Sequence, residues 1–336
     1  MNPLFALFFS LSSTASGAYL GESIALAVAV SWTVCALLSE TVSRRLGAHV
    51  VNVLRMVLSL LFIGALLWVC TGSPLPPQAD TTTWGWLLAS GLVGYVFGDY
   101  CLFNAYLLIG SRFGQLFMTI APAVSALAGW GLLGERLSAQ ALLGMAVTTT
   151  GIAVSILGRG APDEEGEGRR RRKVRLNLPT RGVLLGIGAG VGQGLGLTLS
   201  AVGLKHYAAV WTVAKVGTST AFLLPFAATQ MRAVAGLPGF LLLLFLAGKG
   251  DALRRACTDG RGWLLMAATV VFGPFVGVSL SLMATQYTST GVAMTIMSLS
   301  PVLILWPAHV LFGQRVTRRE VVGALISVAG VALFFV

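Results

Sequence analysis

Two stretches of the chain decide its fold. They are GSRFGQLFMTIAPAVSALAGWGLLGERLSAQALLGMAVTTTGIAVSIL at residues 110–157 and TSTGVAMTIMSLSPVLILWPAHVLFGQRVTRREVVGALISVAGVALFF at residues 288–335. The two align at a shift of 179 residues, and the alignment extends upstream of the quoted stretches. Matched positions include Gly98 with Gly277, Ala105 with Ala284, Pro122 with Pro301, Gly134 with Gly313, Gly144 with Gly323 and Gly151 with Gly330. The chain is therefore predicted to contain two copies of one unit.

The composition is that of a membrane protein. The 336 residues are 56% apolar and only 10% charged, and the mean hydropathy is +0.83. Soluble domains carry about 25% charged residues. Long apolar runs recur along the whole chain, which indicates a polytopic membrane protein. This composition argues against a secreted disulfide-rich domain, a nucleic-acid-binding module and an ordinary cytosolic enzyme.

Each apolar run is long enough to cross a hydrocarbon core of about 30 Å with some tilt. Because lipid offers no hydrogen bonds to the backbone, the runs are predicted to be helices. The predicted fold class is therefore all-α, a polytopic membrane protein with ten transmembrane helices. The predicted spans are 21–43, 48–71, 84–109, 112–134, 138–158, 182–204, 222–247, 262–287, 291–312 and 318–336.

These spans divide the chain into a first five-helix repeat at 1–158, a basic linker at 159–181 and a second repeat at 182–336. Because each repeat holds an odd number of helices, the second copy must cross the membrane in the opposite sense. Two inverted five-helix repeats are typical of secondary transporters. The shift between aligned residues increases by about 16 along the chain, so we expect about 16 extra residues in the second copy, near 206–221. The apolar segment 3–11 is too short to span and is interpreted as an interfacial lead-in.

Lysine and arginine counts predict the orientation. Loops on the side of the linker hold 18 of these residues, whereas those on the other side hold three, Arg136, Lys205 and Lys215. Cytoplasmic loops are enriched in Lys and Arg. We therefore expect a cytoplasmic linker and outside termini in the plasma (inner) membrane. We expect the net charge of +11 to set the orientation in the membrane and to contact lipid headgroups, and not to bind nucleic acid.

Cysteine and histidine patterns predict no metal site, no disulfide and no cofactor. The four cysteines have no CxxC spacing, and the three histidines are scattered. No Walker motif is present, so ATP hydrolysis is not the expected driving force. Gly182, Gly186, Gly190 and Gly194 recur at every fourth position, which favours close helix packing over a dinucleotide-binding loop.

The two quoted stretches resemble the EamA-type repeat of the drug/metabolite transporter superfamily. That pattern has a mid-helix proline, a small and aromatic run, Gly-Glu, and a helix that opens and closes on glycine. One departure is that Gly134-Glu135 of the first copy becomes Gly313-Gln314 in the second. The resemblance implies a ten-helix basket and secondary transport of a small organic metabolite or drug, often as proton-coupled or facilitated export. A monomer would suffice for that activity.

Ionisable residues inside apolar runs are candidates for the functional site. Arg55 and Arg232 are repeat equivalents, and each either binds an anionic group or forms a structural pair, with Glu40 a possible partner of Arg55. Asp99 is the deepest acid and shares a helical face with Tyr95 and Phe103. Its alternatives are a substrate or proton role and plain hydrogen bonding.

Repeat-related positions supply further cavity candidates in pairs, although polar residues in such helices also serve as interhelical contacts. The complete set of predicted substrate-contacting residues is Trp32, Tyr95, Asp99, Phe103, Asn104, Gln115, Thr119, Gln193, Ser200, Ser279, Met294 and Ser298. Pro122 and Pro301 are either hinges or static kinks. Because Val278 stands at the position equivalent to Asp99, we expect one acidic and one apolar wall, which suits an amphipathic or aromatic solute.

Two other functions compete with transport of a small metabolite. A flippase for a lipid-linked substrate is the closer alternative, and it would need a lateral opening and a longer apolar groove. An intramembrane aspartyl protease is suggested only by Val96-Phe97-Gly98-Asp99. That chemistry needs two carboxylates that share a proton, and the chain offers no second acid in a matching motif. We therefore predict that the protein is not an enzyme.

Overall fold

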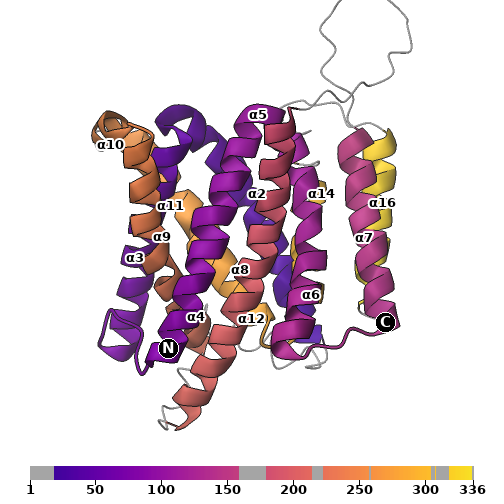
Figure 1. Ribbon diagram of the computed structural model, residues 1–336, viewed down its shortest axis with the longest axis horizontal. Helices are drawn as coiled ribbons and strands as arrows, with labels where there is room; N and C mark the ends of the chain where they lie inside the picture. The colour runs from indigo at the N-terminus through magenta and orange to yellow at the C-terminus, as the bar shows by residue number, and fades with distance from the viewer. Residues whose placement is uncertain are drawn as a thin grey trace, which may run out of the picture.

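The computed structural model describes residues 19–158, 179–213, 222–256, 259–303, 307 and 318–334. Across these residues the regular secondary structure is entirely helical, which confirms the all-α fold class. Figure 1 shows the helices standing side by side as one bundle. The first half contains α2 (Leu20–Leu46), α3 (Ala48–Thr71), α4 (Thr81–Gly91), η2 (Leu92–Asp99), α5 (Tyr100–Phe117), η3 (Met118–Ile120), α6 (Ala121–Leu133) and α7 (Ala139–Gly158).

The second half has a similar order, with the short helix α10 added and with a break between α12 and α13. Its elements are α8 (Thr180–Val213), α9 (Leu224–Leu246), α10 (Gly250–Ala256), α11 (Gly260–Val270), η5 (Val271–Val278), α12 (Ser279–Ala284), α13 (Thr290–Met297), α14 (Ser300–Leu303) and α16 (Arg318–Ala332).

Local sequence explains several helix ends. The Asp80 side chain accepts a hydrogen bond from the Thr83 N–H at 2.9 Å and caps the start of α4. Gly72 follows the last residue of α3 with a φ of 76°, a left-handed conformation that favours glycine. Both signals lie in the connection between α3 and α4, at one end of the bundle.

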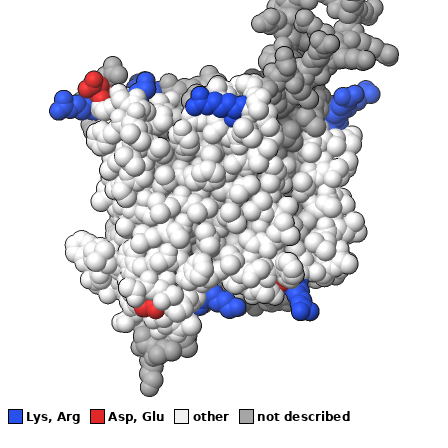
Figure 2. Space-filling view, in the orientation of Figure 1, with Lys and Arg blue, Asp and Glu red and all other residues white. Residues whose placement is uncertain are grey.

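The surface has the charge distribution of a membrane protein. Six described helices are long and apolar enough to cross a membrane, and two shorter apolar helices cover 118–133 and 139–155. Figure 2 shows charged side chains at two opposite ends of the molecule, with an uncharged band between them. The exposed side chains include Leu127, Trp130, Leu264 and Leu325. The chain is thus an integral, multi-pass membrane protein, although the described residues do not establish the predicted number of ten spans.

Helix α8 is longer than predicted. The expected span ended at residue 204, but the helix continues to Val213 and is about 51 Å long at 1.5 Å per residue. Its additional turns are held by the loop before α4: His206 Nε2 lies 2.9 Å from Asp80 Oδ2, and Tyr207 Oη donates to the Pro77 carbonyl at 2.5 Å. Much of the predicted insertion at 206–221 is therefore a helical extension, and 214–221 lies outside the described residues.

One π-helical segment lies in the third membrane helix of each half. They are η2 at Leu92–Asp99 and η5 at Val271–Val278. At the shift of 179 residues, Leu92 falls on Val271 and Asp99 falls on Val278, so the two segments match end to end. A π-helix widens the turn, and such segments are frequent at functional sites.

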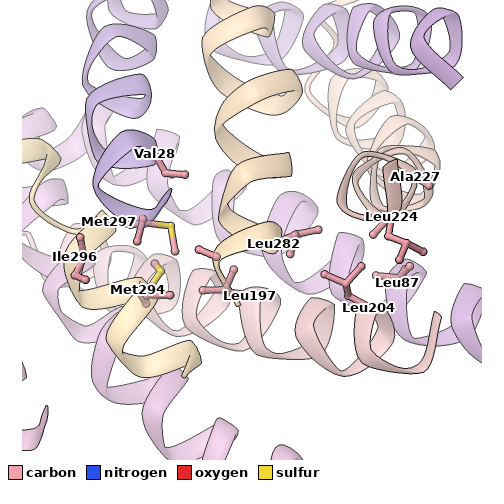
Figure 3. Close-up of a cluster of buried hydrophobic side chains, with 14 of the residues drawn as sticks. Val28, Leu87, Leu197, Leu204, Leu224, Ala227, Leu282, Met294, Ile296 and Met297 are labelled. Atoms are coloured by element: carbon pink, nitrogen blue, oxygen red, sulfur yellow. The ribbon is translucent and has the colours of Figure 1, made fainter. Parts of the chain in front are cut away.

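Glycines bring the central helices into close contact, as predicted. A Cβ at Gly192 would lie 2.7 Å from the Gly98 Cα, and one at Gly196 would lie 2.5 Å from the Gly94 Cα. Helix α8 therefore packs directly on η2. Figure 3 shows Leu197 of α8 with Leu282 and Met294 within a cluster of buried apolar side chains.

The last helices of the two halves, α7 and α16, pack as an antiparallel pair. Thr148 Oγ1 donates to the Ser327 carbonyl at 3.5 Å, and Ser327 Oγ donates to the Thr148 carbonyl at 3.4 Å. These two residues are equivalent at the shift of 179, so the pair makes reciprocal contacts. A Cβ at Gly151 would lie 2.4 Å from the Ser327 backbone nitrogen.

We expect Gly151→Leu to separate α7 from α16 and to lower thermal stability in detergent. Backbone atoms block the added side chain, and overpacking of this kind costs about 1–3 kcal/mol. The matched control is Gly131→Leu in α6, where no atom lies within 4 Å of the added Cβ. Equal unfolding midpoints for the two variants would contradict the close packing.

Candidate functional site

A buried ion pair lies where α3 meets η2. The Arg55 Nη2 donates to Asp99 Oδ2, and these side chains are only 13% and 9% exposed. Gln193 of α8 donates to the other carboxylate oxygen, with 2.7 Å between its Nε2 and Asp99 Oδ1. The same Nε2 lies 3.2 Å from the Gly94 carbonyl. Asp99 is therefore held by one side chain from each half of the chain.

A second buried arginine approaches the same π-helical segment. Arg232 of α9 is 4% exposed, and its Cζ lies 4.6 Å from the centre of the Tyr95 ring. A Cβ at Gly94 would lie 2.9 Å from Arg232 Nη2, so glycine leaves room for the guanidinium. Among the described residues Arg232 has no carboxylate partner. Contact with the face of an aromatic ring is its main electrostatic compensation.

Several polar atoms of this cluster lack hydrogen-bond partners within the described part of the chain. They are Arg55 Nε, Arg232 Nε, Tyr95 Oη and Asn52 Oδ1. Buried polar groups in proteins are nearly always hydrogen-bonded, and exceptions call for an explanation. The cluster therefore has hydrogen-bonding capacity that the protein itself does not fill.

The fold delivers these groups from four separate elements. Arg55 lies on α3, Asp99 and Tyr95 on η2, Gln193 on α8 and Arg232 on α9. The glycine contacts between α8 and η2 bring Gln193 to the carboxylate, since a Cβ at Gly98 would lie 3.2 Å from its Nε2. The site thus depends on small residues that allow backbones to approach.

A small pocket opens beside the ion pair at the start of α3. Phe103 lines it, and the Arg55 Cζ lies 5.9 Å from the centre of the Phe103 ring. Asn52, one helical turn before Arg55, also lines the pocket. The remaining lining residues are Ala48, His49, Tyr100, Asn104, Phe240 and Leu243. Asn104 donates to the Tyr100 carbonyl within its own helix at 2.8 Å.

The predicted site residues thus separate into groups. Tyr95, Asp99, Phe103, Gln193, Arg55 and Arg232 come together, and Asn104 lies in the adjoining pocket. Others contact neighbouring helices or their own helix. The Trp32 side chain packs where a Cβ at Gly277 would lie, and Met294 lies in the apolar core. Three serines make hydrogen bonds: Ser200 with the Ser90 hydroxyl, Ser279 to the Thr229 hydroxyl, and Ser298 to the Met294 carbonyl of its own helix. Substrate contact by these residues stays a prediction.

A few predicted residues are only partly covered by the structure. The side chains of Glu40, Gln115 and Pro301 lie outside the described side chains, and Thr119 lies in η3. We expected Pro122 to lie in the middle of a helix, but it does not. It occupies the first turn of α6, where a proline loses no intrahelical hydrogen bond, and the break precedes it at η3. Pro301 likewise is the second residue of α14, after a turn at 298–299.

Contacts between helices close both ends of the bundle. Glu135 accepts hydrogen bonds from the Thr290 N–H at 3.1 and 3.0 Å and from Thr290 Oγ1 at 2.8 Å. It therefore caps α13 of the other half. Near the start of α11, Arg45 pairs with Asp259 through two hydrogen bonds. The hydrogen bonds from Arg45 lower the pKa of the Asp259 carboxyl, so the pair stays ionised at neutral pH.

Comparison with known proteins identifies the family. The sequence model of the EamA-like transporter family matches residues 19–157 and 194–336. The chain belongs to the EamA-like transporter family. This finding confirms the resemblance seen in the two repeats. No curated protein matches the chain.

A solved structure described only as "Crystal structure of protein" shares the fold of this EamA-like transporter. Its TM-score is 0.62 and its sequence identity 17%, over 93% of this chain and 95% of that chain. At that identity the likeness concerns the fold alone. Family membership makes the protein a membrane transporter of the drug/metabolite type, with a small-molecule substrate.

We expect Arg55→Gln to destabilise the protein by about 3–5 kcal/mol, because it leaves the Asp99 carboxylate buried without its cation. Adding Asp99→Asn should restore much of that loss, since a neutral amide pair replaces a lone charge. Unfolding of both single variants and the double variant gives the coupling free energy. Additive effects in this cycle would contradict an energetic role for the ion pair.

Proposed function

We propose that this protein is a secondary transporter that exports a small organic metabolite or drug by alternating access, with the Arg55–Asp99–Arg232 cluster as its substrate site. The observation that carries the proposal is a buried set of charges with unfilled hydrogen bonds at the meeting of both halves. Ionisable residues inside membrane helices are costly and mark substrate or proton pathways.

The contacts between halves support an inverted repeat. Thr148 and Ser327 are equivalent residues that exchange hydrogen bonds across an antiparallel helix pair. Such reciprocity is what a two-fold axis perpendicular to the two helices produces. The matching positions of η2 and η5 favour the same relation. Inverted repeats allow one fold to adopt two packings that open to opposite sides.

The closures at the two ends suit alternating access. Helix α2 runs between them: Glu22 near its start accepts from Thr288 Oγ1 at 2.6 Å, and Arg45 near its end pairs with Asp259. Because Asp99 and Arg232 are only 6% and 4% exposed, a substrate reaches them when one of the closures separates. We assign the end with Arg45 to the cytoplasm, together with the 159–181 linker.

Reporter fusions test this topology. A fusion after Gly168 should show cytoplasmic activity, and a fusion after Val336 should not, because 18 loop cations lie on the linker side against three on the other. Cytoplasmic activity of the C-terminal fusion would contradict both the orientation and the odd number of crossings per half.

Transport itself can be measured after a thermal-shift screen has supplied a ligand. A ligand present at 100 times its Kd stabilises by about 2.7 kcal/mol. The ligand with the largest shift is then tested in proteoliposomes by counterflow and by accumulation under a pH gradient. The wild type should do both. Absence of counterflow for every stabilising ligand would argue against a transporter.

We expect Asp99→Asn to abolish accumulation driven by the pH gradient while counterflow persists, because the amide keeps the size of the side chain and removes its titration. Asp80→Asn is the matched control, since Asp80 is a carboxylate that pairs with His206 outside the site. Normal pH-driven accumulation by Asp99→Asn would place proton coupling elsewhere.

A further inference from the structure

We infer that the substrate is a small organic anion whose carboxylate or phosphate binds Arg232 and Arg55, and that the Asp99 carboxylate takes the place of this oxyanion at Arg55 when no substrate is bound. The inference rests on the proposed function, because it names the substrate class of the same site. It revises the expectation of an acidic wall for an amphipathic or aromatic solute.

The charge inventory of the site favours an anion. Arg55 and Arg232 each contribute one positive charge that they cannot lose, and Asp99 contributes one negative charge. The cluster therefore has an excess of one positive charge. Among the described side chains, the other titratable groups near Asp99 are Tyr95 of η2 and Cys35 of α2, which are ordinarily neutral. This excess positive charge attracts an anion and disfavours a cation.

The unfilled donors point to the same chemistry. Within the described part of the chain, the Nε of both arginines and the hydroxyl of Tyr95 have no hydrogen-bond partner. An Nε and an adjacent Nη of one guanidinium form the fork that binds two oxygens of a carboxylate or phosphate. A cationic or neutral solute would leave Arg232 uncompensated.

Binding of this anion changes the protonation of Asp99. When a substrate oxyanion takes over the Arg55 guanidinium, Asp99 loses its cation partner in a buried place. The carboxylate then binds one proton from water, and Gln193 remains beside it as a hydrogen-bond partner. The excess of one positive charge is the same before and after, because one monoanion and one proton have entered together. Anion and proton thus favour each other's binding, which is the linkage of a cotransporter. An anion concentrated in the cytoplasm would leave with its proton.

The test uses four probes of similar size: benzoate, phenyl phosphate, benzamide and benzylamine. Thermal shifts of the purified wild type should show binding of benzoate, of phenyl phosphate or of both, and the two anions together distinguish a carboxylate site from a phosphate site. Benzamide and benzylamine should bind at least tenfold more weakly. A pH indicator in weak buffer should report uptake of about one proton per bound monoanion.

Variants separate the roles of the three charges. Arg232→Gln should weaken anion binding at least tenfold. The double variant Arg55→Gln with Asp99→Asn keeps the net charge of the wild type and should bind the anion without proton uptake. Arg136→Gln is the matched control, because this arginine lies in the turn between α6 and α7 and should leave binding and proton uptake unchanged.

The outcomes distinguish this inference from the proposed function. Stronger binding of benzamide or benzylamine than of both anions, or anion binding without proton uptake by the wild type, would overturn the inference and leave a transporter in place. No stabilisation by either anion at tens of millimolar would overturn it as well. Anion binding with proton uptake but no counterflow in proteoliposomes would instead overturn the transport function.

Discussion

The arrangement of this protein depends on one constraint: two guanidinium groups that cannot lose their charge lie inside an apolar bundle. The charge of Arg55 is balanced by Asp99, and the charge of Arg232 is balanced in part by the face of the Tyr95 ring. Both partners lie on η2, so helices from both halves must converge on that short segment. The absence of side chains at Gly94 and Gly98 provides the room for this convergence.

The repeat makes the framework symmetric, while the site is not. The π-helical segments match between the halves, and α7 and α16 make reciprocal contacts. Yet Asp99 is matched by Val278, and both arginines face the first-half segment. A symmetric framework can rock between two packings, whereas an asymmetric site gives one set of groups to the substrate in both of them. One binding site in two packings is what alternating access requires.

The helical class, the repeat and most members of the charge cluster could be predicted from the sequence, because charged residues within apolar runs and equally spaced glycines can be recognised in the sequence itself. Sequence reasoning grouped Asp99 with Tyr95 and Phe103 through helical spacing. It did not anticipate η2, since a π-helix leaves no composition signal, and it did not bring Gln193 to Asp99 or Arg232 to Tyr95. Those contacts join residues about 100 or more positions apart, so they depend on how helices pack. The length of α8 was also missed, because Lys205 and His206 suggested an interface where the helix in fact continues.

The two closures differ in strength, and this difference bears on the direction in which the site opens. The Arg45–Asp259 pair is 45% and 21% exposed, so water and salt screen it and it adds little to the closed state. At the other end Glu135 accepts three hydrogen bonds from Thr290, which is buried. If Glu135 moved away, the Thr290 hydroxyl and backbone N–H would be buried without an acceptor, which costs free energy. Of these two contacts, the Arg45–Asp259 pair is therefore the easier one to separate. The pocket lined by Phe103 and Asn52 lies at that same end, beside the start of α3, so it is close to the more exposed of the two contacts.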